Sequence, residues 1–249
     1  MKDRLKDLLA KEESRRDFIK LAIETGLFAG VASSGAFSSV AYAIGGDVPR
    51  ALGEGESIYK IQGKVSVDAR KADKSTVIKA NSFIKTGSNS LIIFKVGSDA
   101  HILRENSEMQ LSGENFVEEG LRLVTGKLLS VFGTRSQGSS HTLRTTTATI
   151  GIRGTGVYAE SESDHSYVCT CYGVVDISSS KDSNSKERIT AQHHDAPRYI
   201  MRDGKAGSLI VPAPMKNHDD EELLLVESIV GRATPFSGIR SYSKPRKSY

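Results

Sequence analysis

The two cysteines of this 249-residue chain lie one residue apart, as Cys169 and Cys171 in the stretch YVCTCYG. Thiolates bind soft or borderline metal ions, and paired thiols can also form a disulfide. In a strand, residues i and i+2 face the same side, so both sulfurs should project together. The two Cα atoms would then lie about 6.7 Å apart, near the outer limit for a disulfide. The spacing therefore favours a shared metal ion or an easily reduced thiol pair, and inert buried thiols are the third interpretation.

Histidines supply the other ligands of the predicted metal site. His193 and His194 are adjacent in ITAQHHDAP, and His218 stands in KNHDDEE. Thiolates combined with imidazoles suit a Zn or Cu ion. In an extended segment adjacent side chains point oppositely, so we expect one of the paired histidines to join the cysteines, with Asp195 as acceptor for an imidazole N–H. The predicted metal ligands are Cys169, Cys171, His193, His194 and His218.

The N-terminus has the features of an export signal. SRRDFIK contains two adjacent arginines, an apolar run rich in small residues follows, and Ala41-Tyr42-Ala43 matches a signal-peptidase site. An arginine pair is typical of the twin-arginine route. We predict that residues 1–43 are a twin-arginine signal peptide, cleaved after Ala43, and that the mature protein is periplasmic. An uncleaved signal anchored in the inner membrane is the alternative, although Glu24 makes this run a poor bilayer span.

The composition argues against two functional classes. The chain is 38% hydrophobic and 26% charged, with a net charge of +4, which is not the strongly basic balance of a nucleic-acid-binding domain. We find no serine in a nucleophile elbow and no pair of carboxylates singled out by spacing. We therefore expect a non-enzymatic protein that binds no nucleic acid. A hydrolase with scattered acidic residues is a further alternative.

Short apolar runs alternate with Gly, Asn and Ser turns between Ile58 and Ile177, which is typical of an all-β body. The expected strands lie around Val77, at 83–84, 91–96 and 101–103, on either side of Thr125-Gly126, on either side of Gly173, and around 188–190 and 199–201.

A single helix is predicted near the C-terminus, over 217–230. Asn217 or His218 can cap it, the acidic residues 219–222 fill a first turn where they complement the helix dipole, and Gly231 suits the position just past the end.

Several stretches resemble the FecR domain, a periplasmic all-β module of bacterial sensory systems. They are ANSFIKTGSNSLIIF, LRENSEMQLSG, LRLVTGKLLSVF and, above all, TTTATIGIRGTGVYAE followed by YVCTCYGVVDIS. The resemblance implies a twisted β-roll or short solenoid-like β body, and a binding or signalling role with an envelope protein or small ligand as partner. The chain departs from the family pattern at 96–99 and at the two cysteines, where ordinary residues are usual. We expect neither the anti-sigma segment nor the membrane span of the iron-transport members.

The predicted organisation is a signal peptide over 1–43, a linker over 44–57, a FecR-like β domain over 58–178, an extension over 179–232 and a basic, disordered tail over 233–249. The predicted function is an exported, non-enzymatic FecR-domain protein that acts as a periplasmic binding or signalling module with a Cys/His metal site. The mature form is expected to have no transmembrane span. The alternative function is a metal-dependent or thiol redox protein that uses the paired cysteines and histidines.

Overall fold

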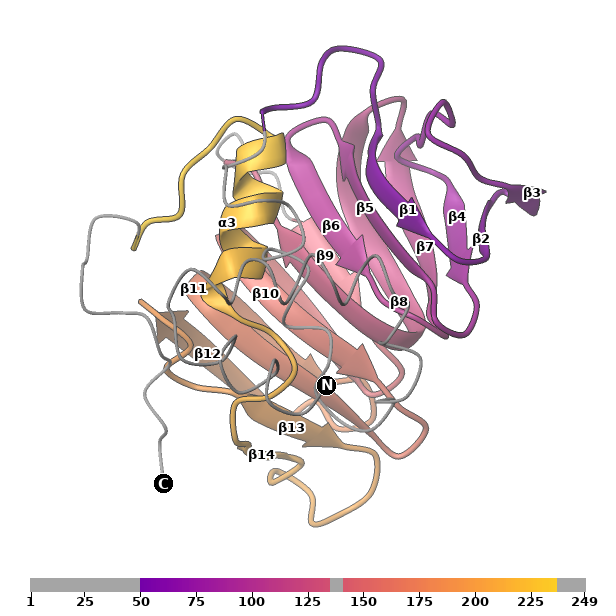
Figure 1. Cartoon of the computed structure of the whole chain (residues 1–249). Coiled ribbons are helices and arrows are strands. Elements are labelled where there is room, and N and C mark those ends of the chain that lie inside the picture. The colour runs from indigo at the N-terminus through magenta and orange to yellow at the C-terminus, as the bar shows by residue number, and fades with distance from the viewer. Residues whose placement is uncertain (1–49, 135–140, 237–249) are drawn as a thin grey trace, which may run out of the picture. The chain divides into compact units, whose positions relative to one another are not determined.

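The computed structural model of this chain describes residues 50–134 and 141–236. The predicted signal peptide lies outside the described residues, as do residues 44–49 of the predicted linker and residues 237–249 of the tail. The described residues belong to one compact unit, Val40–Tyr249. They form strands and one short helix (Figure 1), so the predicted all-β class with one C-terminal helix is confirmed.

Within the described ranges, fourteen strands join in one sheet. The strands are β1 (Ile58–Gln62), β2 (Val65–Val67), β3 (Arg70–Lys71), β4 (Phe83–Thr86), β5 (Leu91–Val96), β6 (Asp99–Leu103), β7 (Glu108–Glu114), β8 (Val117–Val131), β9 (His141–Arg144), β10 (Ala148–Ser161), β11 (His165–Ser179), β12 (Lys186–Ala191), β13 (Arg198–Met201) and β14 (Ile210–Pro212).

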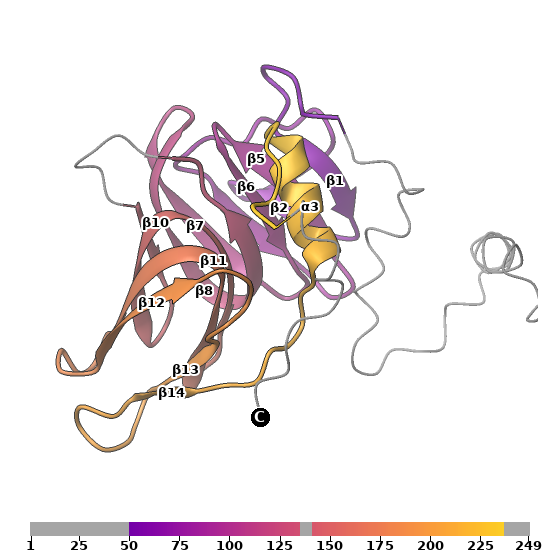
Figure 2. The same ribbon diagram turned by 90° about the vertical axis from the view of Figure 1, so that its left-hand side faces the viewer.

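The long strand β8 lies at the centre of the sheet and changes its neighbours along its length. Its first half pairs with β7 and, in parallel, with β9, whereas its second half pairs with β6 and β10. β10 likewise pairs with β9 at its start and with β8 at its end. The long strands therefore pass from one half of the sheet to the other, and the sheet curves (Figure 2).

Two glycines let these long strands bend without ending. Gly126 and Gly173 have φ angles of +93° and +92°, which L side chains rarely adopt. A Cβ on Gly126 would lie 2.0 Å from the Ser107 hydroxyl, and one on Gly173 would lie 2.6 Å from the Cβ of Thr155. The predicted strand ends at these glycines are therefore wrong, because β8 and β11 each continue for 15 residues through the bend.

The remaining strand predictions have mixed outcomes. The strand at 91–96 matches β5, and those at 83–84 and 101–103 fall within β4 and β6. The strand around Val77 is wrong: this residue is exposed in an irregular segment. Asp73 organises that segment, since its Oδ1 accepts the Ser75 N–H at 2.8 Å in a local turn.

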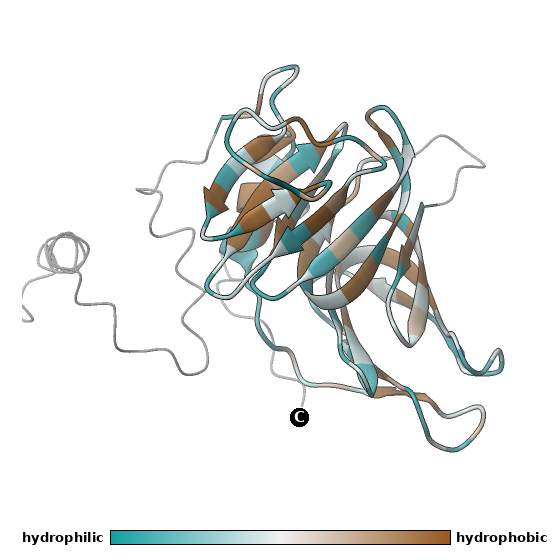
Figure 3. Cartoon of the chain, turned by 90° about the vertical axis from the view of Figure 1, so that its right-hand side faces the viewer, coloured by the Kyte–Doolittle hydropathy of each residue, from teal (hydrophilic) through white to brown (hydrophobic). Residues whose placement is uncertain are grey.

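Apolar residues gather on both faces of the curved sheet. Along the strands, apolar and polar residues alternate (Figure 3). One buried cluster contains Phe94, Leu123, Ile150 and Val168 and fills the inner face. A second cluster combines Ile102, Leu129 and Tyr158 with the apolar residues of the helix α3 (Asp220–Ile229). This second layer, between the outer face and α3, is where both cysteines lie.

The helix α3 begins later than predicted. Its N-cap is Asp219, whose side chain accepts the Glu222 N–H, and Glu222 reaches back to the Asp219 N–H in a capping box. The expectation that Asn217 or His218 caps the helix is therefore wrong. Gly231 has a φ of +74° just past the end, as expected. Among the described residues, no helix combines the length and apolar character that a bilayer crossing requires.

Candidate metal centre

A β-bulge in β11 places the cysteines beneath α3. Thr170 pairs with Val157 and Tyr172 pairs with Gly156 on β10, so Cys171 is an extra residue without a direct partner in this ladder. Cys169 and Cys171 are both free and buried. The bulge keeps both of them, and Tyr172 after them, in the cluster under α3. Past the bulge the alternation reverses, and Val175 belongs to the inner cluster.

Four of the five predicted ligands converge at this point. The metal-binding atoms of Cys169, Cys171, His194 and His218 all lie within 4.8 Å of one another, and all four residues are buried. His194 Nδ1 lies 3.5 Å from the Cys169 sulfur and 3.0 Å from His218 Nε2. The sulfurs come from β11, one imidazole from the turn after β12, and the other from the segment just before α3.

His194 is oriented through its backbone and its second ring nitrogen. Its backbone N–H donates to the Cys171 carbonyl at 2.9 Å, and its φ of +54° is uncommon for a residue with a side chain. Its Nε2 lies 3.2 Å from Asp220 Oδ1. A carboxylate accepts a hydrogen bond, so Nε2 carries the proton in the neutral ring and Nδ1 presents its lone pair to the sulfurs.

His218 is held in the complementary tautomer. Its Nδ1 lies 2.8 Å from the Lys216 carbonyl oxygen, which can only accept, so Nδ1 donates and Nε2 is left with the lone pair. The ring also stacks on Tyr158, with 4.4 Å between centroids and 10° between planes. In their neutral forms, both imidazoles therefore turn a nitrogen lone pair toward the two sulfurs, as metal-ligating histidines do.

His193 does not join the cysteines. Its Nε2 lies 2.8 Å from Asp220 Oδ1, the same oxygen that contacts His194, and these three residues form a second group with ligand atoms within 4.8 Å of one another. The expected role of Asp195 is also wrong. Its carboxylate instead accepts the backbone N–H groups of Gln192 and His193, which stabilises the turn. Asp220 is the carboxylate that orients the imidazole.

Charges around the cluster shift the protonation of both cysteines. Burial tends to raise the pKa of Cys169, but a hydrogen bond with Cys171 and the charge of His218 bring it well below the ordinary thiol value. Burial and the neighbouring Cys169 raise the pKa of Cys171 well above that value. Burial also lowers the pKa of His194, yet hydrogen bonds with Asp220 and Cys169 raise it to about 9. The thiolate form of Cys169 is therefore stabilised beside a protonated His194 imidazole. A metal cation could bind there and release those protons.

Two acidic residues at the start of α3 make specific side-chain contacts in addition to complementing the helix dipole. Asp220 contacts both paired histidines, and Glu222 is buried against Arg104, whose Nη2 lies 2.7 Å from Glu222 Oε1. Sequence reasoning missed both roles. No local pattern could have indicated them, because Asp220 is 27 and 26 residues from the two histidines and Glu222 is 118 residues from Arg104.

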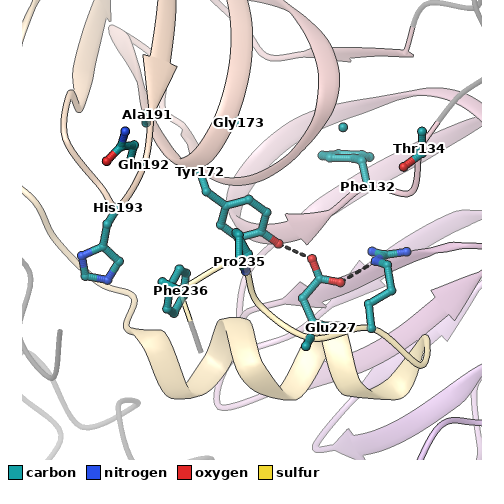
Figure 4. Close-up of a pocket in the computed structure, with 13 residues that line it drawn as sticks. Phe132, Thr134, Tyr172, Gly173, Ala191, Gln192, His193, Glu227, Pro235 and Phe236 are labelled. Atoms are coloured by element: carbon teal, nitrogen blue, oxygen red, sulfur yellow. Dashed lines mark hydrogen bonds and ion pairs between the residues drawn. The ribbon is translucent and has the colours of Figure 1, made fainter. Parts of the chain in front are cut away.

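A cavity of about 550 Å³ lies beside the cluster, and His193 forms part of its wall (Figure 4). Phe132, Tyr172, Glu227 and Phe236 also line it. The Tyr172 hydroxyl donates to Glu227, which in turn accepts from Arg232 Nε at 2.6 Å. The cavity thus has aromatic walls and a fixed charged pair, and it reaches His193, which shares the Asp220 carboxylate with His194.

Part of the chain is similar to solved structures. Two crystal structures, at 1.65 and 2.50 Å, of a candidate anti-sigma factor from Parabacteroides distasonis ATCC 8503 match it with a TM-score of 0.43 and 15% sequence identity. The match covers 57% of this chain and 62% of that protein, so the chain spans less than two thirds of its length. No protein-family model matches this chain, and no curated protein matches it either.

Proposed function

We propose that this chain is an exported FecR-type binding or signalling module in which one Zn or Cu ion is held by Cys169, Cys171, His194 and His218. The observation that carries the proposal is the convergence of two sulfurs and two imidazole nitrogens, all within 4.8 Å in a buried site. The sequence stretches that resemble the FecR domain support the module type.

The separations suit a tetrahedral ion. With Zn–S bonds of about 2.3 Å and Zn–N bonds of about 2.05 Å, an ideal tetrahedron separates two nitrogens by about 3.3 Å and a sulfur from a nitrogen by about 3.6 Å. The corresponding distances are 3.0 Å between the imidazoles and 3.5 Å between His194 and the Cys169 sulfur. An ion could therefore enter with side-chain shifts of a few tenths of an ångström, replacing the protons that now bridge these atoms.

The ion would connect the sheet to the helix. Its ligands come from β11, from the turn after β12 and from the residue next to the N-cap of α3, so binding would tie α3 to the outer face. Loss of the ion would leave the contacts of Asp220, the Arg104–Glu222 ion pair, the Tyr172–Glu227 hydrogen bond and the apolar packing as links between the helix and the sheet. Metal occupancy, or oxidation of the thiols, would then control how firmly α3 covers the sheet, which is a means of signalling to a partner.

The decisive experiment is elemental analysis of mature protein purified without a histidine tag. We expect about one equivalent of Zn or Cu per chain, as in a structural site with four protein ligands, and its loss in the Cys169→Ser/Cys171→Ser variant. Less than about a tenth of an equivalent in wild type, with thiols that alkylate freely, would contradict the site.

Export and partnership are tested separately. Replacing Arg15 and Arg16 by lysine should retain the protein in the cytoplasm if the twin-arginine route is used, with a soluble periplasmic protein of another route as control. Capture from a periplasmic extract with metal-loaded and metal-free protein should recover an envelope protein in one state only. Equal recovery in both states would show that partner binding does not depend on the metal.

A thiol redox protein is the second proposed function. It rests on the two free cysteines, whose sulfurs belong to one compact group. Exchange with glutathione disulfide would oxidise both thiols to a Cys169–Cys171 disulfide and reduce the reagent to two glutathione thiols. Mass spectrometry would show the loss of two hydrogens per chain. Metal-free protein that stays reduced in excess reagent would rule this function out.

A further inference from the structure

The cavity shown in Figure 4 has the composition of a small-molecule site. Its volume is about 550 Å³, which falls in the range of pockets that bind small ligands. Phe132, Tyr172 and Phe236 line it, and all three are buried. They come from distant parts of the chain, since the first follows β8, the second belongs to β11 and the third follows α3. Aromatic walls favour a flat occupant that can stack on them or meet them edge-on.

The aromatic rings of one wall hold each other in place. Phe236 meets Tyr172 edge-on, with 6.0 Å between the ring centroids and 66° between the planes. It meets the His193 ring in the same manner, at 4.9 Å and 64°. Edge-to-face contacts of this kind are favourable and fix the orientation of each ring. The wall is therefore preformed, and a ligand would pay little for ordering it.

The Glu227 carboxylate supplies a fixed acceptor in this lining. Its Oε1 accepts from the Tyr172 hydroxyl, and its Oε2 accepts from Arg232 Nε at 2.6 Å. Burial and the charge of Glu227 raise the pKa of Tyr172, so the hydroxyl keeps the proton that it donates. Each carboxylate oxygen has two lone-pair sites. Glu227 can therefore accept a further hydrogen bond from a ligand without losing either of these two.

The Arg232 guanidinium supplies a donor beside that acceptor. Its Nε donates to Glu227 and its Nη1 donates to the Ser98 carbonyl, whereas Nη2 is buried and makes no hydrogen bond to any residue that the structure describes. A buried donor without an acceptor is costly. The Arg232 side chain as a whole is 29% exposed, so a small movement can bring Nη2 to an occupant of the cavity.

The charges of the lining favour a neutral ligand. A ligand carboxylate would be repelled by Glu227 and a ligand ammonium by Arg232, and His193, the other ionisable wall residue besides Tyr172, contacts Asp220. An amide avoids both repulsions, because its carbonyl can accept from Arg232 while its N–H donates to Glu227. We propose that this cavity binds a small, neutral aromatic molecule that carries an amide group. The site is independent of the metal centre, because neither Glu227 nor Arg232 is a proposed metal ligand.

The test compares three probes that share one ring system and differ in their polar group. These are 2-naphthamide, the anion 2-naphthoate and the cation 2-naphthylmethylammonium, and equilibrium dialysis against the full chain measures the Kd of each. We expect a Kd below about 1 mM for the amide and binding at least about tenfold weaker for both charged probes. An amide that binds more weakly than this limit, or a charged probe that binds as tightly as the amide, would overturn the proposal.

Arg232→Met locates the binding, because it removes the donor and leaves Glu227 without its counter-charge. We expect this variant to bind 2-naphthamide at least about tenfold more weakly and the ammonium probe more tightly than wild type does. Arg188→Met is the control, since Arg188 is exposed, pairs with Asp176 and does not line the cavity. Amide affinity that is unchanged in a folded Arg232→Met protein would overturn the proposal. If that variant fails to fold, the three probes on wild type decide by themselves.

Discussion

His194 Nδ1 lies 3.0 Å from His218 Nε2, although the residues are 24 positions apart and belong to different elements. Each ring directs its other nitrogen to an oxygen acceptor, Asp220 for one and the Lys216 carbonyl for the other. The two facing nitrogens therefore need a shared proton or a metal ion, and the cysteine sulfurs beside them make the ion chemically reasonable.

Removal of His194 should weaken metal retention more than any change in the acidic turn. We expect His194→Ala to lose the ion, Asp220→Asn to weaken binding about 10- to 100-fold by releasing the imidazole, and Glu221→Gln to have little effect. Competition with a chromogenic chelator measures all three affinities. Similar affinities for the His194→Ala and Glu221→Gln proteins would refute the ligand assignment.

The neighbouring His193 should behave differently, because its Nε2 contacts Asp220 and not the sulfurs. We expect His193→Ala to keep its full metal stoichiometry and to lose less than about tenfold in affinity, whereas His218→Ala should lose the ion. Elemental analysis after gel filtration distinguishes the two variants. If His193→Ala empties the site and His218→Ala does not, the roles of these histidines are reversed.

The bend in β11 should be essential for both stability and the site. Gly173→Ala would place a Cβ 2.6 Å from Thr155 at a φ of +92°. Gly207→Ala is the matched control, because its φ is +76° but no atom lies within 4 Å. We expect the control to cost about 1–2 kcal/mol from the backbone alone and Gly173→Ala to cost more. Urea unfolding measures both costs, and equal values would show that the close approach at Thr155 is unimportant.

The buried Glu222 should make folding stability depend on pH. Burial raises the pKa of this carboxyl from 4.5 to about 6, and Arg104 offsets only part of that effect. The folded state therefore holds the proton more tightly than the unfolded state. The resulting stabilisation is complete below pH 4.5 and is lost as the pH rises to about 6, a difference of about 2 kcal/mol.

Glu222→Gln tests this dependence and retains a capping-box side chain at the third helical position. We expect the free energy of unfolding, measured with urea between pH 4.5 and 7, to change less with pH in the variant than in wild type. The other titrating groups are the same in both proteins. Asp176→Asn should differ from wild type only at lower pH, because Arg188 lowers the pKa of that exposed carboxyl. If the free energies of unfolding of wild type and Glu222→Gln changed equally with pH, the raised pKa of Glu222 would be contradicted.

Local patterns predicted the elements that depend on neighbouring residues alone. β5 is a run of apolar residues between two turns, and its bounds were predicted correctly. Gly126 and Gly173 looked like turn residues because glycine permits a positive φ, which both of them adopt. Whether such a residue reverses the chain or bends a continuing strand depends on which strands lie alongside, and that information is not local.

The amino-acid sequence by itself determined the all-β class, the C-terminal helix and the types of ligand, because alternation, turn residues and the chemistry of sulfur and imidazole are properties of short segments. Only the tertiary structure decided which residues meet. Pairing of β10 with β11 creates the bulge at Cys171, the turn after β12 brings His194 back to the sulfurs, and packing of α3 presents Asp220 and His218. These contacts join positions far apart in the chain, and burial of apolar surface between strands and helix holds them together.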